Sequence, residues 1–126
     1  IAVRLLAEVD AALQSPPIEV PAAEIEARRT WCTKTLGRIR NATPNDVEAH
    51  YRRHWLLVEL LDLYFVVRHQ HYLGPKESFR RLEKNDPLAP RAFAEALAQG
   101  AGVGELDRLV HVVCQIDEPR VASSPV

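Results

Sequence analysis

The sequence has 126 residues, of which 47% are hydrophobic and 26% are charged, as is typical of one soluble globular domain. Sixteen lysines and arginines oppose seventeen aspartates and glutamates, so the formal net charge of −1 gives no overall attraction to nucleic acid or to an anionic membrane. Two cysteines are too few for a disulfide scaffold and suit a reducing cytosol. We therefore expect a cytoplasmic protein that binds neither a membrane nor nucleic acid.

The chain order predicts a single helical domain over residues 1–126. Apolar residues recur at helical spacing in residues 1–14, and the prolines of residues 15–21 end that helix and form a linker. Residues 22–116 form the expected bundle core, and residues 117–126, rich in serine and proline, read as a frayed tail. Because the sequence begins at isoleucine and contains no methionine, we interpret it as part of a longer chain.

Five helices are predicted within the core, because apolar residues recur every three to four positions and Gly and Pro separate the segments. No stretch alternates with the period of two that a half-buried strand needs. The predicted fold class is all-α, an up-and-down helical bundle of about five to six helices with a long central helix. The core helices are expected over residues 22–42, 44–68, 76–84, 90–99 and 105–116.

The long helix is predicted to be covered by protein on nearly every side, because residues 55–67 are apolar apart from Glu59 and Asp62. Cys32 and Cys114 are read as small buried residues on two packed helices. The side chains expected to be mostly buried are Trp55, Leu56, Val58, Leu60, Leu61, Leu63, Phe65 and Val66.

Glu59 and Asp62 are candidate ligand-binding residues, because their spacing places both carboxylates on neighbouring parts of one helix surface. One interpretation is a cleft that binds cationic groups, or a general base among the two acids. The other is an ion pair with the preceding basic helix, through Arg28, Lys34 or Arg38.

Asp46, His50 and His54 recur every four residues, so a carboxylate and two imidazoles share one helix face. This spacing suits a metal site and gives a third functional interpretation, a metal-binding helical bundle. The alternative is that these are ordinary polar side chains in the first turns of an amphipathic helix.

A basic and aromatic cluster follows the long helix: Arg68, His71 and Tyr72 come just before the Gly74-Pro75 turn. With Lys76 these side chains form a candidate corner for a phosphate or a nucleotide, because the free N–H groups of the next helix attract anions. The structural alternative is that the basic groups cap the helix C-terminus.

The run from Trp55 to Lys76 resembles the helical C-terminal domain of bacterial nucleotidyltransferases of the kanamycin-nucleotidyltransferase type, within the HEPN-like group. The matching features are a long apolar helix that ends in Arg68, then Tyr72, the Gly-Pro turn, Lys76, and a later Asp-Pro break. The basic helix around residues 27–38 is also similar. The HEPN ribonuclease signature is not matched, because the residue types of 68–72 lie too close together, so RNA cleavage is not expected.

The resemblance implies a helical accessory or substrate-binding domain that has no chemistry of its own. In that family the catalytic Gly-Ser and Asp-x-Asp motifs lie on an N-terminal α/β domain, and neither motif occurs in this sequence. No cofactor is therefore expected in this chain, whereas a partner catalytic domain, upstream or in trans, would use Mg²⁺ and a nucleotide. The alternative is a protein-interaction bundle, such as a toxin-like or antitoxin-like homodimer.

Overall fold

The structure is a computed structural model that describes residues 19–115, and over that range it contains helices and no strand. The predicted all-α class is confirmed, and each helix predicted for the core is present within a few residues of its expected bounds. The predictions for residues 1–14 and 117–126 concern residues outside the described range. The helices are α2 (Ala22–Arg40), α3 (Val47–Val67), α4 (Pro75–Asn85), α5 (Ala89–Leu97) and α6 (Val103–Cys114).

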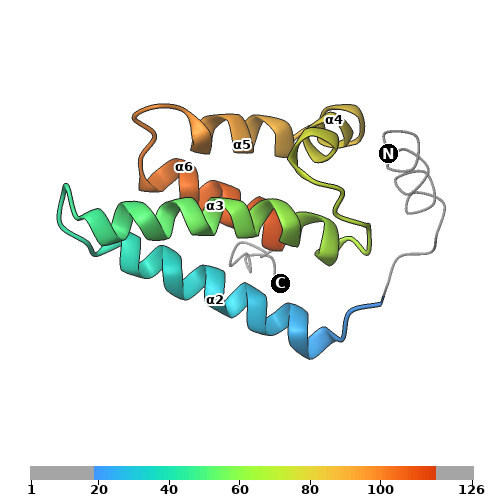
Figure 1. The fold of residues 1–126 in the computed structure, drawn as a ribbon, viewed down its shortest axis with the longest axis horizontal. Coiled ribbons are helices and arrows are strands. Elements are labelled where there is room, and N and C mark those ends of the chain that lie inside the picture. Colours follow the sequence, from blue (N-terminus) through green and yellow to red (C-terminus); the bar gives the residue numbers. More distant parts are fainter. Residues whose placement is uncertain (1–18, 116–126) are drawn as a thin grey trace, which may run out of the picture.

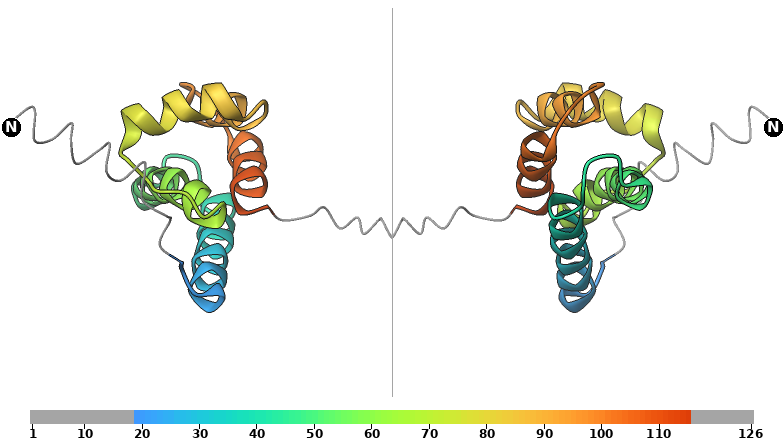
Figure 2. Two further views of the ribbon diagram at one scale, coloured as in Figure 1. Left: turned by 90° about the vertical axis from the view of Figure 1, so that its right-hand side faces the viewer. Right: turned by 90° about the vertical axis from the view of Figure 1, so that its left-hand side faces the viewer.

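The helices are arranged with α2 and α3 antiparallel and side by side, while α6 packs against both (Figure 1). α5 packs on α6, and α4 packs on α5. Seen from the end of the molecule, α4 and α5 lie on one side of α3 and α6, and α2 lies on the opposite side (Figure 2). Within residues 19–115 no helix combines the length and the hydropathy that crossing a bilayer requires.

Local sequence signals explain where the helices begin. Asp46 is the N-cap of α3, and its side chain accepts hydrogen bonds from the amides of Glu48 and Ala49. Gly74 precedes α4 with a φ of 91°, a left-handed conformation that glycine adopts without steric cost, and Pro75 occupies the first turn of the helix. These signals fix the turns on both sides of α3.

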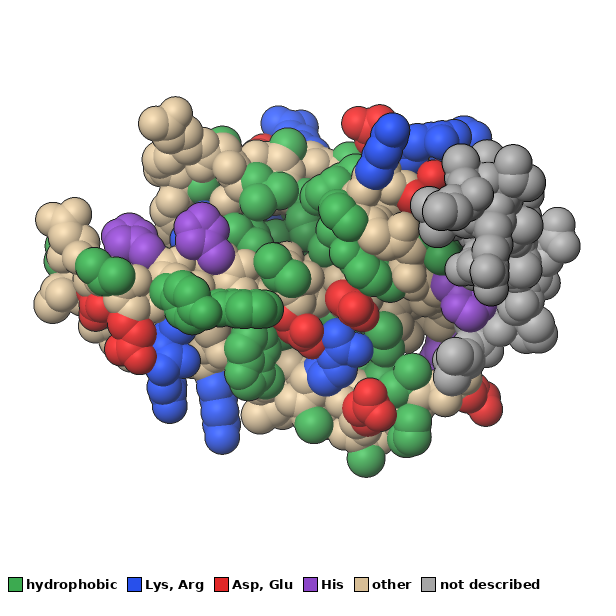
Figure 3. Space-filling view, viewed as in Figure 1, with side chains coloured by type: hydrophobic (Ala, Val, Ile, Leu, Met, Phe, Trp, Pro, Cys, Tyr) green, Lys and Arg blue, Asp and Glu red, His purple; other side chains and the backbone are tan. Residues whose placement is uncertain are grey.

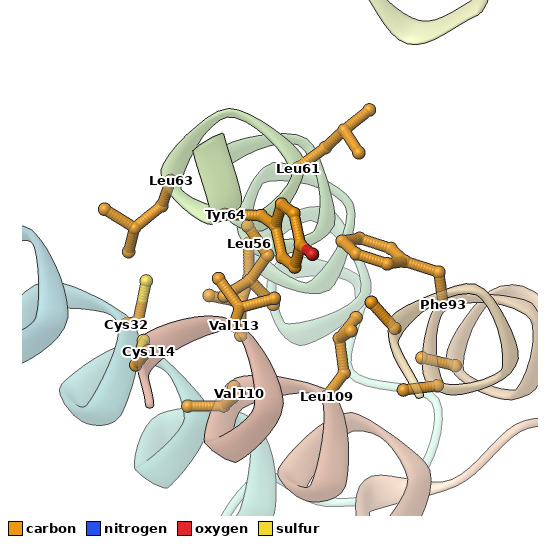
Figure 4. Packing of buried hydrophobic residues seen from close by; sticks show 14 of the residues in the cluster. Cys32, Leu56, Leu61, Leu63, Tyr64, Phe93, Leu109, Val110, Val113 and Cys114 are labelled. Carbon is orange, nitrogen blue, oxygen red and sulfur yellow. The ribbon is translucent and has the colours of Figure 1, made fainter. Parts of the chain in front are cut away.

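The core lies between α2, α3, α5 and α6, with Leu82 contributed by α4, and aliphatic side chains fill it together with Tyr64, Phe65 and Phe93 (Figure 4). On α3 a stripe of residues spaced four, three and four positions apart is buried. The prediction of burial is confirmed for five of the eight residues, which are Leu56, Leu60, Leu61, Leu63 and Phe65.

The prediction is wrong for Trp55 and Val58, whose exposed fractions are 53% and 60%, and Val66 is only half-buried. The reason is geometric. The principal neighbours of α3 are α2 and α6, so its surface is not covered on every side. Trp55 and Val58 lie at the edge of the contact with α2, beside Trp31, and most of each side chain is left in contact with solvent.

Candidate functional site

The predicted corner at the end of α3 is held together by Arg68, the C-cap residue of that helix. Its Nη1 donates to the carbonyl oxygens of Tyr64 and Val113, both at 3.1 Å, and its Nη2 donates to that of Val112 at 2.9 Å. The guanidinium also lies 3.7 Å from the centroid of the Tyr64 ring. Arg68 therefore joins the ends of α3 and α6, as the capping interpretation proposes.

The other three residues of the corner have different environments. His71 is half-buried, and its carbonyl oxygen accepts a hydrogen bond from Arg81 at 3.4 Å. Tyr72 is 37% exposed and its ring centroid lies 6.5 Å from that of Phe65, whereas Lys76 is exposed. A ligand at this corner stays a prediction, and Tyr72 and Lys76 are the side chains placed to meet one.

Asp86, in the Asp-Pro break, extends the same network to α5. Its carboxylate accepts a hydrogen bond from the Tyr64 hydroxyl and two more from the amides of Leu88 and Ala89. Burial acts to raise the pKa of Asp86, but these hydrogen bonds and the charge of Arg68 outweigh it, so the pKa is lowered from its ordinary value. Burial and the bond to Asp86 raise the pKa of Tyr64 to about 12. The network thus ties α3 to α6 and to the start of α5.

The two acids of α3 are both paired with one basic residue of α2. Arg28 Nε donates to Glu59 at 2.6 Å, and its Nη2 donates to Asp62 at 3.3 Å. The predicted ion pair is confirmed, with Arg28 as the partner among the three candidates. The side chains are 23 to 39% exposed, so the group lies at the surface rather than in the core.

Asp46, His50 and His54 line one hollow of about 510 Å³ at the α3 N-terminus, together with residues of the loop that joins α5 to α6. Asp46 uses one carboxylate oxygen to cap α3, and both histidines are exposed. No group of three His, Cys, Asp or Glu side chains in the described part of the chain is placed to hold a metal ion. The geometry gives the metal interpretation no further support.

A feature that sequence reasoning missed is an exposed aromatic surface formed by α2 and α3. We define the α2–α3 surface as Trp31, Tyr51, Trp55 and Val58, with exposed fractions of 43%, 62%, 53% and 60%. Tyr51 and Trp55 meet edge to face, with ring centroids 6.2 Å apart. Figure 3 shows hydrophobic side chains running along the α2 and α3 face and meeting a group of acidic and basic side chains.

The α2–α3 surface is hollowed on both sides of its two tryptophans. A hollow of about 420 Å³ is lined by Trp31, Trp55, Val58 and the Arg28–Glu59 pair, and an adjoining one of about 240 Å³ is lined by both tryptophans and Tyr51. The larger hollow is also lined by Glu24. Since one guanidinium serves both Glu59 and Asp62, negative charge exceeds positive charge at this end of the surface.

The signal that could have found this surface is a second stripe on α3. Tyr51, Trp55 and Val58 are spaced four and three positions apart, so they share one helix face, and a different face carries the buried stripe of Leu56 and Leu60. A continuous apolar run hides this division, because both stripes contribute to it.

Comparison of the chain with family models, with curated proteins and with solved structures finds no match.

Proposed function

We propose that this chain is a helical accessory domain, without chemistry of its own, that binds a protein partner through the α2–α3 surface. The observation that carries the proposal is the exposure of both tryptophans of the sequence, Trp31 and Trp55, beside Tyr51. Tryptophan, tyrosine and arginine are the residues that most often dominate the free energy of protein association. Contiguous apolar surface of this kind is typical of interaction sites.

The partner that fits the surface is an amphipathic helix. A groove between two antiparallel helices accepts the side chains of a third helix, and bulky apolar residues would fill the two hollows beside Trp31 and Trp55. The excess of acid at Glu24, Glu59 and Asp62 favours a lysine or arginine at that end of the partner helix. A basic amphipathic helix is therefore the occupant proposed.

The resemblance to nucleotidyltransferase accessory domains suggests which protein supplies this helix. In that interpretation the partner is the catalytic nucleotidyltransferase domain, upstream in the same polypeptide or in trans, and Mg²⁺ and the nucleotide belong to the partner. The candidate corner of Tyr72 and Lys76 would then face the acceptor or the nucleotide. The alternative is a homodimer of the toxin or antitoxin kind, in which two copies bury their tryptophans together.

The test compares two double substitutions. Trp31→Ala with Trp55→Ala removes the surface, and Leu88→Ala with Leu97→Ala is the matched control, because both leucines are exposed on the α5 segment. Binding of a catalytic nucleotidyltransferase domain is measured by calorimetry, and self-association by sedimentation equilibrium. We expect the tryptophan variant to lose at least about tenfold in affinity and the control to keep it.

The outcomes separate the two partners. Binding of the catalytic domain that is lost only in the tryptophan variant supports the accessory domain, whereas self-association lost only in that variant supports the homodimer. Equal affinities for the tryptophan variant and for the unsubstituted protein, toward both partners, contradict the proposal.

A further inference from the structure

The two cysteines of the sequence, 82 positions apart, meet in the core. Cys32 lies in the middle of α2, Cys114 is the last residue of α6, and the exposed fraction of each is 0%. α2 and α6 are in contact, and each of the two thiols shifts the pKa of the other. Figure 4 shows the two side chains together beneath Leu63. A disulfide needs such proximity and, in addition, a suitable orientation of the two side chains.

The position of Cys114 determines how a reagent can reach this pair. Both thiols are covered in the native fold, but Cys114 belongs to the last turn of α6, which ends at the left-handed residue Gln115. Helix ends open locally at lower free energy than the core. Arg68 holds this last turn closed, because its guanidinium donates to the carbonyl oxygens of Val112 and Val113. Arg68, one of the residues of the predicted ligand corner, therefore also limits the access of a reagent to Cys114.

The two thiols also differ in reactivity. The neighbouring Cys32 thiol lowers the pKa of the Cys114 thiol and outweighs the opposite effect of burial there, and the charges of Arg29 and Arg68 act in the same direction as Cys32. The neighbouring Cys114 thiol and burial raise the pKa of Cys32. The thiolate is the nucleophile in disulfide exchange, and Cys114 lies in the last turn of α6 whereas Cys32 lies in the middle of α2, so we expect Cys114 to react first.

We propose that Cys32 and Cys114 form a redox-active pair that closes to an intramolecular disulfide on reaction with a low-molecular-weight disulfide, and that opening of the last turn of α6 at Arg68 sets the rate. The Cys114 thiolate attacks glutathione disulfide, forms a mixed disulfide and releases one glutathione thiolate. The Cys32 thiolate then attacks the Cys114 sulfur and releases the second glutathione. The protein loses two electrons and two protons, and the glutathione disulfide gains them.

The product would join the middle of α2 to the end of α6. That bond closes a loop of more than eighty residues, which restricts the unfolded chain strongly. The disulfide would restrict the motion of α2 and so of the α2–α3 surface, because α2 contributes Trp31, the residue next to Cys32, to that surface. This inference does not depend on the proposed function, since it concerns a different pair of helices and a different chemistry.

The experiment incubates the reduced protein with glutathione disulfide and follows it by intact mass. We expect a loss of about 2 Da with both thiols consumed, and a rise of about 5–15 °C in the melting temperature. Cys32→Ser should stop at the glutathione adduct on Cys114, whereas Cys114→Ser should remain unmodified under the same conditions. An adduct that persists in the unsubstituted protein, or a disulfide between two chains, overturns the proposed pair.

A matched pair of arginine variants tests the route of access. Arg68→Lys weakens the clamp on the last turn of α6, and we expect at least a severalfold increase in the oxidation rate. Arg53→Lys is the control, because Arg53 is also half-buried and donates to the carbonyl oxygens of Ala96 and Gly102, away from Cys114. Equal acceleration in both variants shows that the whole fold must open, and it overturns the local route.

Discussion

The two halves of α3 differ in whether the side chains suited to binding are exposed to solvent or are bonded within the fold. In the N-terminal half, Trp55, which the sequence assigns to the core, is exposed and forms the α2–α3 surface with Tyr51, Val58 and Trp31. At the C-terminal end, Arg68, which the sequence offers to a ligand, is bonded to carbonyl groups of its own fold. The difference depends on which helices pack nearby. α6 ends beside Arg68, whereas the face that carries Tyr51 and Trp55 is exposed to solvent.

This comparison shows that residue type is a weak guide to role until the neighbours are known. A cation at a helix end is attracted to any free carbonyl group nearby, and α6 supplies two of them. An apolar run supplies more hydrophobic surface than two packed neighbours can cover. Four predictions test this division of roles, in order of decreasing effect.

The largest effect should come from the buried stripe of α3. Leu60→Ala should lower the free energy of unfolding by about 2–5 kcal/mol, because it removes buried surface and leaves a cavity. Val58→Ala, two residues away and 60% exposed, should change it by less than about 0.5 kcal/mol. Urea denaturation of both variants measures the difference. A similar loss for both would mean that Val58 is covered and that the exposed surface is smaller than described.

The next effect concerns the clamp at Arg68. Arg68→Ala should cost about 1–3 kcal/mol, because it removes three hydrogen bonds and leaves carbonyl groups of α6 without a donor. Lys76→Ala, an exposed cation of the same corner, should cost less than about 0.5 kcal/mol. Thermal unfolding compares the two. Near-equal stabilities of the two variants would contradict the structural role of Arg68 and would favour its role in binding a ligand.

A smaller effect is expected at the Arg28 ion pairs. Arg28→Ala should cost about 1 kcal/mol, because it leaves Glu59 and Asp62 without their shared cation at a partly exposed position. The double variant Glu59→Gln with Asp62→Asn should be milder, because it removes both charges and keeps the packing. Denaturant titrations at low salt measure both changes. A double variant that is less stable than Arg28→Ala would contradict this order.

The smallest effect is a pH dependence from Asp86. The folded state lowers the pKa of this carboxyl group, so its contribution to stability is present above the unfolded value of about 3.9 and is lost as the pH falls through the lower folded value. Asp86→Asn should lack that part of the acid sensitivity. Unfolding free energies measured from about pH 7 to about pH 3 test it, and parallel curves for the two proteins would contradict the assignment.

The helices of the core follow from local chemistry that a sequence displays. Gly74 and Pro75 mark the start of α4 through backbone angles that belong to those residues themselves, whereas α3, predicted to begin at residue 44, begins at Val47 because Asp46 caps it. The pairing of the α3 acids with α2 was also predictable, because an acid in an apolar run requires a cation nearby. Which of three basic residues supplies it depends on how α2 and α3 cross, and the sequence does not contain that information.

The candidate site was less accessible to sequence reasoning, for the same reason. Tyr51, Trp55 and Val58 belong to the same largely apolar stretch as Leu56 and Leu60, but their side chains project from a different face of α3. A hydrophobic pattern shows that a side chain is apolar, whereas its burial depends on how many helices surround it. The partner of Arg68 lies 44 residues away on α6, so only the packed fold reveals it.

The most direct test of the account uses the two tryptophans as reporters, since the sequence contains no others. The chain is labelled with 5-fluorotryptophan, and the fluorine resonances of Trp31 and Trp55 are recorded in light and heavy water with and without the catalytic domain, and at rising protein concentration. We expect large solvent-isotope shifts for both residues in the dilute protein and their loss when a partner or a second copy binds. Small shifts in the dilute protein, or large shifts that neither the catalytic domain nor a second copy reduces, would contradict it.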